Sequence, residues 1–136
     1  MTNSANQKRL RFDHASVSHE PDGRCHAQVT ITFGERVIRT DAVNDADGVG
    51  PLKAAAVATL RAIEDAAEMR FTSSLADLDH VNALGKALIA VLVDIQFEGR
   101  EVQVFGSCQI AGNDIDAAVK AALNATNRFF ELSMRS

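Results

Sequence analysis

The sequence contains neither tryptophan nor tyrosine, so seven phenylalanines supply the whole of its conventional aromatic content. Proteins that hold single-stranded nucleic acid stack the bases on aromatic side chains, and this composition offers no such platform. Positive charge is also scarce, because the formal net charge is −4 and lysine and arginine form no run. Nucleic acids bind to a basic face. We therefore expect no nucleic-acid partner.

Cysteine and long apolar runs are equally scarce. Two cysteines do not make a disulfide framework, and we expect Cys25 and Cys108 to be small, buried side chains within strands. The longest apolar run, 87–93, is too short to span a bilayer. Residues 1–9 lack the apolar centre of a signal peptide and are predicted to form a disordered tail. These features predict a cytoplasmic protein with no membrane partner.

The common catalytic and metal-binding motifs are absent as well. The chain has no G-x-S-x-G, no H-E-x-x-H and no P-loop lysine. Its histidines lack zinc-site spacing, and the carboxylates of Asp77 and Asp79 have no recognisable partner for acid–base work. We therefore predict no catalytic residue, no metal site and no cofactor.

What the sequence does contain is a repeated order of elements. Alternating and helical apolar spacings predict three strands and a helix, then the same again, over 9–19, 25–33, 36–43, 51–67, 73–84, 86–97, 100–108 and 113–133. Asn113 is the predicted N-cap of the second helix, where Asp114 and Asp116 lie near the positive helix end. The length of 136 residues fits one domain, predicted over 10–132.

A shift of 64 residues brings the two halves into register. It matches identical residues along strand, turn and helix, namely Val29 with Val93, Ile31 with Ile95, Phe33 with Phe97, Arg36 with Arg100, Gly48 with Gly112, Ala54 with Ala118 and Ala58 with Ala122. The shift predicts two βββα units, about 10–69 and 71–132. The predicted fold class is α+β, with antiparallel sheet and helices packed on one face.

The strand at 88–97 is apolar on both faces, which is unusual for an antiparallel strand with one wet side. Either it is central and covered twice, or its second face contacts another subunit. The alanine-rich helices also permit close approach of neighbouring elements. We therefore expect a homodimer.

The turn Gly48-Val49-Gly50-Pro51 at the first helix start allows three interpretations: a nucleotide site, an anion site, or a plain helix cap. The nucleotide interpretation fails because the P-loop lysine and the βαβ context are both missing. The other two remain open from the residues alone.

Four segments, "FDHASV", "GVGPLKAA", "FEGREVQVFG" and "NDIDAAVKAALNATNR", occur in an order and spacing that resemble the C-terminal regulatory domain of 2-isopropylmalate synthase. Citramalate synthases and some homocitrate synthases carry similar domains. The resemblance covers residues 9–131. It implies two βββα units, dimerisation, and feedback inhibition by leucine or another branched-chain amino acid within branched-chain amino-acid biosynthesis.

The resemblance also implies where the ligand lies: between the two units, near the helix starts. The positions that match are Gly48, Val49, Gly50, Pro51, Leu52, Asp79, His80, Ala87, Asn113, Asp114 and Ile115. The chain departs from the family where tyrosine is usual, with histidine at His80 and His14. The catalytic barrel of the synthases does not fit in this length. The resemblance therefore implies a domain that is not an enzyme alone, acting in cis or in trans with a synthase, or else an interaction module that has lost its ligand.

Physical chemistry suggests how such a site would work. A helix start offers unpaired N–H groups to the ligand's carboxylate, and glycine lets the backbone approach closely. Asp79 is the predicted acceptor for the ammonium group, with backbone carbonyls as the alternative. The side chain would enter a small apolar pocket lined by Leu52, Ala55, Ala87 and Ile115.

Overall fold

The computed structural model describes residues 9–135. Its elements follow the predicted order: β1 (Leu10–His19), β2 (Arg24–Phe33), β3 (Arg36–Asp45), α1 (Gly50–Ala66), β4 (Thr72–Ala83), β5 (Lys86–Phe97), β6 (Arg100–Gln109) and α2 (Asp114–Ser133). Each predicted element is present, with ends that differ by at most two residues. The tail predicted over 1–9 lies almost wholly outside the described residues.

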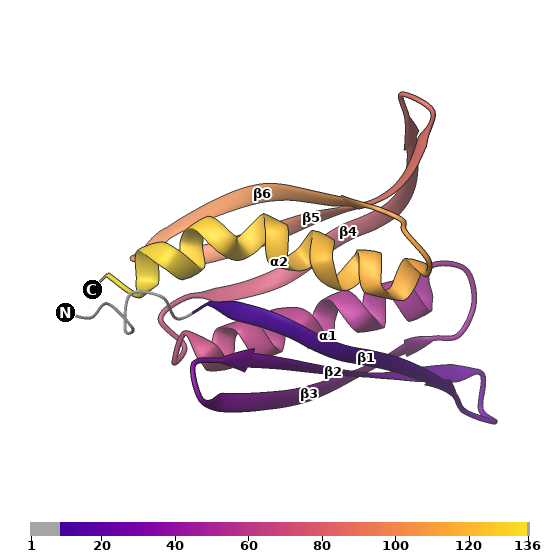
Figure 1. The fold of residues 1–136 in the computed structure, drawn as a ribbon, viewed down its shortest axis with the longest axis horizontal. Coiled ribbons are helices and arrows are strands. Elements are labelled where there is room, and N and C mark those ends of the chain that lie inside the picture. The colour runs from indigo at the N-terminus through magenta and orange to yellow at the C-terminus, as the bar shows by residue number, and fades with distance from the viewer. Residues whose placement is uncertain (1–8, 136) are drawn as a thin grey trace.

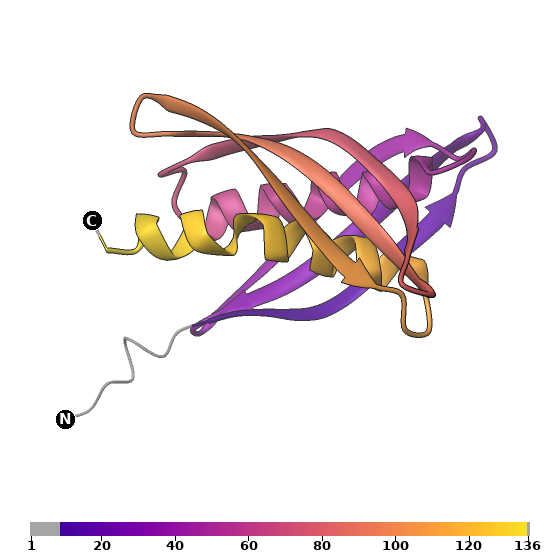
Figure 2. The same cartoon turned by 90° about the horizontal axis from the view of Figure 1, so that it is seen from above.

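The elements form three layers (Figures 1 and 2). One antiparallel sheet has the order β1-β2-β3, the other has the order β4-β5-β6, and the two helices lie between them. Helix α1 packs mainly on the first sheet and α2 on the second, and the helices contact each other. The predicted α+β class with two βββα units is therefore confirmed. Each sheet has one covered face and one face that the described chain leaves open.

Alternation along the central strands builds the core. Ala27, Val29 and Ile31 of β2 are fully buried against the helices, and β5 presents a matching apolar row. The helices contribute small side chains, because most of the buried residues of α1 are alanines. Small residues let sheet and helix approach each other closely. Strand β5 is central in its sheet, but the helices cover only one of its faces, so the described chain does not cover it twice as the first of the two alternatives expected.

The structure refines the repeat. A shift of 64 residues relates β2 to β5, β3 to β6, and the start of α1 to that of α2. The first strands differ, because His19 pairs with Cys25 whereas His80 pairs with Ile89. Strands β1 and β4 are therefore related by 61 residues. The cause is the length of the hairpin, because six residue steps lead from His19 to Cys25 whereas nine lead from His80 to Ile89.

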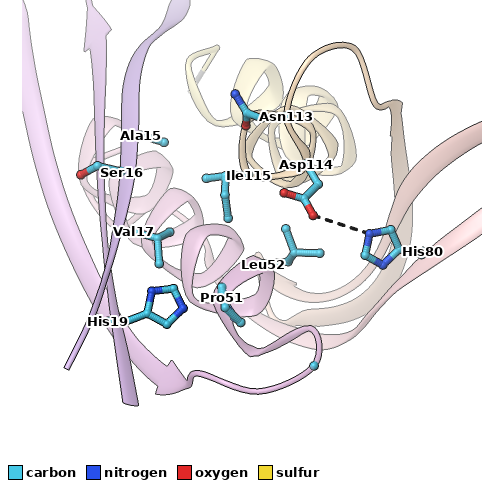
Figure 3. Close-up of a pocket in the computed structure, with 11 residues that line it drawn as sticks. Ala15, Ser16, Val17, His19, Pro51, Leu52, His80, Asn113, Asp114 and Ile115 are labelled. Carbon is cyan, nitrogen blue, oxygen red and sulfur yellow. Dashed lines mark ion pairs between the residues drawn. The ribbon is translucent and has the colours of Figure 1, made fainter. Parts of the chain in front are cut away.

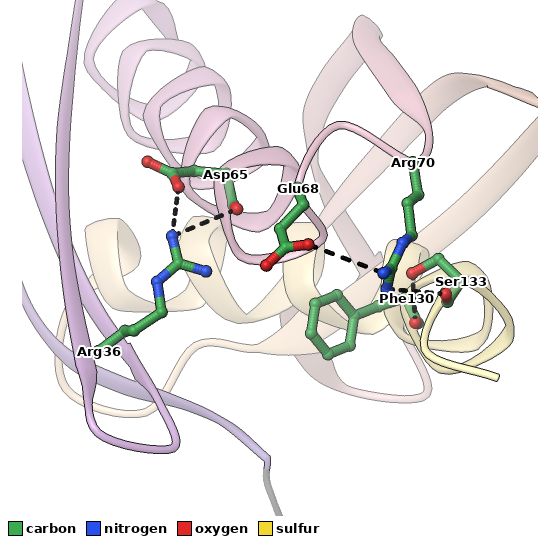
Figure 4. Close-up of polar contacts among 6 residues, drawn as sticks. All are labelled: Arg36, Asp65, Glu68, Arg70, Phe130 and Ser133. Carbon is green, nitrogen blue, oxygen red and sulfur yellow. Dashed lines mark hydrogen bonds and ion pairs between the residues drawn. The ribbon is translucent and has the colours of Figure 1, made fainter. Parts of the chain in front are cut away.

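Polar contacts hold the linker between the two units at the end of the molecule where the helices finish (Figure 4). Glu68 and Met69 have positive φ angles of 54° and 61° and turn the chain out of α1. The guanidinium of Arg70 then donates to the carbonyl oxygen of Ser133 at 3.3 Å, so that a residue of the linker binds the last turn of α2. Nearby, Arg36 forms a 2.6 Å ion pair with Asp65.

The two cysteines differ in burial. Cys25 is fully buried in β2, as predicted. Cys108 is only half-buried, so the prediction is wrong there, because β6 is an edge strand with less cover. Within residues 9–135, neither helix is long and apolar enough to cross a lipid bilayer.

Candidate functional site

A pocket of about 470 Å³ opens between the starts of the two helices (Figure 3). This volume is within the range of small-molecule sites. Strand β1, the α1 start, strand β4 and the α2 start all contribute, through Ala15, Ser16, Val17, His19, Gly48, Pro51, Leu52, His80, Asn113, Asp114 and Ile115. Both repeats therefore supply walls to a single cavity.

Seven of the predicted site residues line this pocket: Gly48, Pro51, Leu52, His80, Asn113, Asp114 and Ile115. The other five, Val49, Gly50, Ala55, Asp79 and Ala87, are not among its lining residues. Ala55 is fully buried in the core. Asp79 precedes His80 in β4, and successive side chains of a strand point to opposite faces. The structure therefore brings His80 to the pocket and leaves Asp79 on the outer face of the second sheet.

The two helix starts differ in charge and capping. Asn113 caps α2, because its side-chain oxygen accepts from the backbone N–H of Asp116 at 2.8 Å, and Asp114 and Asp116 lie in the first turn. At the equivalent position of α1, Val49 makes no side-chain cap, and the first turn contains no acidic residue. The first turn of α1 thus has neither a side-chain cap nor an acidic residue, whereas the start of α2 has both.

The backbone hydrogen bonds at the start of α1 show which N–H groups of its first turn already have an acceptor. The N–H of Gly50 donates to the carbonyl of Asp47, and that of Lys53 donates to the carbonyl of Val49. Pro51 has no N–H to offer. The N–H of Leu52, in the first turn of α1, is one of the backbone donors that an α-helix leaves without an intrahelical partner. A donor of this kind beside a pocket suits an anionic ligand group.

The two glycines of the turn have different roles. Gly48 lines the pocket with φ at +58°, and a Cβ added there would meet no atom within 4 Å. A Cβ on Gly50 would lie 1.8 Å from the carbonyl oxygen of Asp45. Glycine at 48 therefore sets the backbone conformation beside open space, whereas glycine at 50 is required by packing.

An ion pair crosses the mouth of the pocket. The Nε2 atom of His80 lies 3.7 Å from a carboxylate oxygen of Asp114, and both side chains are about half exposed. Figure 3 shows this contact, with His19 from the first repeat on the other side of the cavity. Within residues 9–135, no group of three or more His, Cys, Asp or Glu side chains could hold a metal ion.

Sequence reasoning missed the contribution of β1, which is Ala15, Ser16, Val17 and His19. The 64-residue shift hid it, because His19 and His80 become equivalent only under the shift of 61 that the strand pairing defines. The signal available in the sequence was a histidine near the end of each unit's first strand. Ser16 points its side chain away from the cavity in Figure 3.

The fold and the pocket define a class of α+β domain in which two βββα units enclose a cavity between their helix starts. A family model described as the LeuA allosteric (dimerisation) domain matches residues 1–130 of the chain. The chain therefore belongs to the LeuA allosteric (dimerisation) domain family, which confirms the resemblance found in the sequence. A search of curated proteins finds no match.

Proposed function

We propose that the chain is a homodimeric regulatory domain that binds a free amino acid with a branched, apolar side chain, such as leucine, isoleucine or valine. The domain has no chemistry of its own in this proposal. It acts on a synthase of the 2-isopropylmalate type, either within one polypeptide or as a separate partner. Family membership supports the regulatory and dimerising parts, and the pocket supports the ligand.

The contrast between the two helix starts is the observation that carries the ligand proposal. An α-amino acid is a zwitterion, so it needs a donor for its carboxylate and an acceptor for its ammonium group close together. The N–H of Leu52 and the dipole of α1 supply the first. The carboxylate of Asp114 supplies the second, in place of the predicted Asp79.

The ligand's side chain needs an apolar wall, and both repeats provide one. Val17 comes from β1, Leu52 from α1 and Ile115 from α2. Burial of a branched aliphatic side chain stabilises a complex by about 1.5–3 kcal/mol. A polar side chain would gain little from these walls, which favours the branched-chain class.

Because the ligand contacts both repeats, its binding can change how they are held together. A ligand shifts the population of two arrangements only to the extent that it binds one more tightly. In this proposal the amino acid stabilises one arrangement of the dimer, and the synthase responds to that arrangement.

Calorimetric titration tests the ligand and each of its charges. Leucine, isoleucine and valine are compared with 4-methylpentanoate, which lacks the amino group of leucine, and with isopentylamine, which lacks the carboxylate. We expect binding by at least one amino acid and weak binding or none by both analogues. At a free ligand concentration of about 100 times Kd, binding adds about 2.7 kcal/mol to the free energy of unfolding.

Two matched variants test whether the ligand's carboxylate lies beside the start of α1. Gly48→Asp puts a negative charge in open space beside the α1 start, whereas Gly48→Asn is nearly isosteric and neutral. Both residues tolerate positive φ. We expect the aspartate variant to lose binding and the asparagine variant to keep most of it. Equal behaviour of the two would contradict the placement. No binding of any of the three amino acids at millimolar concentration would favour the dimerisation module without a ligand.

A further inference from the structure

The hairpin that joins β4 to β5 projects away from the rest of the molecule at the end where the helices begin (Figure 1), and its turn consists of Leu84 and Gly85. Both residues have positive φ angles, 54° and 76°. Two-residue turns of this kind favour asparagine, aspartate or glycine first, because a bulky side chain is strained there. Leu84 nevertheless occupies that position and is 100% exposed. The hairpin thus keeps an apolar side chain at its tip despite strain and solvent exposure.

Leu84 continues into an apolar strip on the outer face of the second sheet. We define this strip as Val81, Leu84, Leu88, Leu92 and Phe105. Leu88 pairs with Val81 and Leu92 pairs with Phe105, which is 67% exposed. Because Ile89 and Val91 face the helices, the alternating Leu88 and Leu92 face outward.

The first sheet has no such strip. Under the 64-residue shift, Leu88, Leu92 and Phe105 correspond to Arg24, Gln28 and Asp41. The first hairpin ends in the polar loop 20–23 instead of a leucine. The apolar strip is therefore not required by the βββα fold, since the fold forms once without it. A contiguous apolar patch that the fold does not require indicates a contact surface.

We propose that the apolar strip is the surface on which a second copy of this chain docks, with the two β4–β5 hairpins stacked face to face. The inference rests on the proposed homodimer and names its interface. A two-fold axis runs across the strands through the Leu88–Val81 pair. It brings Leu84 of each copy onto Leu92 and Phe105 of the other.

Charge complementarity supports this register. Asp77 and Asp79 lie on the same outer face, so a face-to-face arrangement that set these residues of two copies opposite each other would bring like charges together. Lys86 is two residues from Leu88 toward the hairpin tip, and Ala90, which pairs with Asp79, is two residues from Leu88 in the other direction. The proposed axis therefore sets Lys86 of one copy near Asp79 of the other. Strained Leu84 gains burial in the same contact.

Sedimentation velocity of the full chain tests the apolar part. Leu84→Asp and Phe105→Asp each place a charge in the strip, and aspartate is tolerated at the positive φ of residue 84. We expect each to raise the dimer dissociation constant at least about tenfold. The control is Val37→Asp, since Val37 is 63% exposed on the outer face of the first sheet. We expect it to leave the dimer unchanged, and circular dichroism checks that every variant is folded.

A charge exchange tests the register. We expect Lys86→Glu and Asp79→Lys each to weaken the dimer about tenfold, and the double variant to restore it to within about threefold of the wild type. A double variant as weak as either single one would overturn the register. A dimer that survives Leu84→Asp and Phe105→Asp would overturn the surface but leave dimerisation standing. A wild-type chain that is monomeric at every concentration would overturn both, and calorimetry of ligand binding would be unaffected by that outcome.

Discussion

At the start of α1 the chain has Val49, and at the equivalent start of α2 it has Asn113 followed by two acidic residues. On the outer faces, the first sheet presents Gln28 where the second presents Leu92. The inward rows of β2 and β5 are instead apolar in both units. The core therefore keeps one pattern in both repeats, whereas the helix starts and the outer faces differ. The proposed ligand site and the proposed interface both lie where the repeats differ.

Loss of the Phe130 side chain is expected to have the largest effect on stability. Phe130 of α2 is 4% exposed and meets Phe33 of the first repeat edge to face, with ring centroids 5.0 Å apart. Phe130→Ala removes a buried ring that joins the repeats, so we expect the free energy of unfolding to fall by about 3–5 kcal/mol. Chemical denaturation measures it. The control is Phe129→Ala, whose ring contacts Phe97 within one repeat and is more exposed. Equal losses would contradict a special role for the contact between repeats.

The next largest effect is expected at Gly106, where α2 crosses β6. A Cβ there would lie 2.3 Å from the carbonyl oxygen of Ala121 and 2.6 Å from the backbone nitrogen of Ala125. Both obstacles are backbone, so the helix would have to move. Gly106→Ala is expected to destabilise by about 1–3 kcal/mol.

The equivalent residue of the first repeat is Ala42, which is buried and already accommodates a methyl group. The reverse change, Ala42→Gly, is expected to cost only about 0.5–1 kcal/mol. Thermal or chemical unfolding of the two variants compares them directly. A Gly106→Ala variant as stable as the wild type would show that α2 can withdraw from its sheet freely.

The sequence alone was sufficient to predict the order of strands and helices. Val29, Ile31 and their counterparts alternate strictly, and the turns between them contain glycine, so strand and hairpin signals agree. The α2 start was equally clear, because Asn113 combines a capping side chain with acidic residues behind it. These local signals also located the half of the pocket that consists of helix starts.

The missing half of the site depended on long-range geometry. In β4, Leu78 shares the inner face with His80, and Val81 shares the outer face with Asp79. Apolar residues occur on both faces, so alternation alone could not decide which of Asp79 and His80 faces the helices. A register shift between Leu75 and Asp77 breaks the alternation further. The contribution of β1 depended on the different lengths of the β1–β2 and β4–β5 hairpins, which the repeat shift had treated as equal.

Removing the cap of α2 is expected to have a moderate effect. Asn113→Ala loses the hydrogen bond to the N–H of Asp116, and loss of such a cap costs about 1 kcal/mol. Asn113→Asp retains an acceptor and serves as the control. Val49→Ala at the start of α1 loses no cap hydrogen bond, because none is present there. Denaturant unfolding measures the free energy of unfolding of each variant. If Asn113→Ala lost no more of this free energy than Asn113→Asp, the side-chain cap of α2 would not stabilise the helix, and the contrast between the two starts would be contradicted.

The smallest effect is expected at the register shifts of the first strands, where the two repeats again differ. Asp13 lies at the shift in β1, and its carboxylate accepts hydrogen bonds from the hydroxyl of Thr32 and from Arg11. The Thr32 hydroxyl first, and Arg11 second, lower the pKa of Asp13 below its usual value. The shift in β4 has Ala76, which cannot titrate. Acid sensitivity from this feature therefore belongs to the first repeat alone.

The sign of the pH dependence follows from that lowered pKa. Asp13 contributes stability above the pKa that it has in the unfolded chain, and the contribution disappears as the pH falls through its lower, folded-state pKa. Thr32→Val removes the main cause, so the pKa of Asp13 should rise toward its usual value and this part of the acid dependence should shrink. Carbon-detected NMR titration of the Asp13 carboxyl group measures the shift directly, with Thr32→Ser as the control that keeps the hydroxyl. An Asp13 pKa that is the same in Thr32→Val and Thr32→Ser would show that the hydroxyl is not its cause.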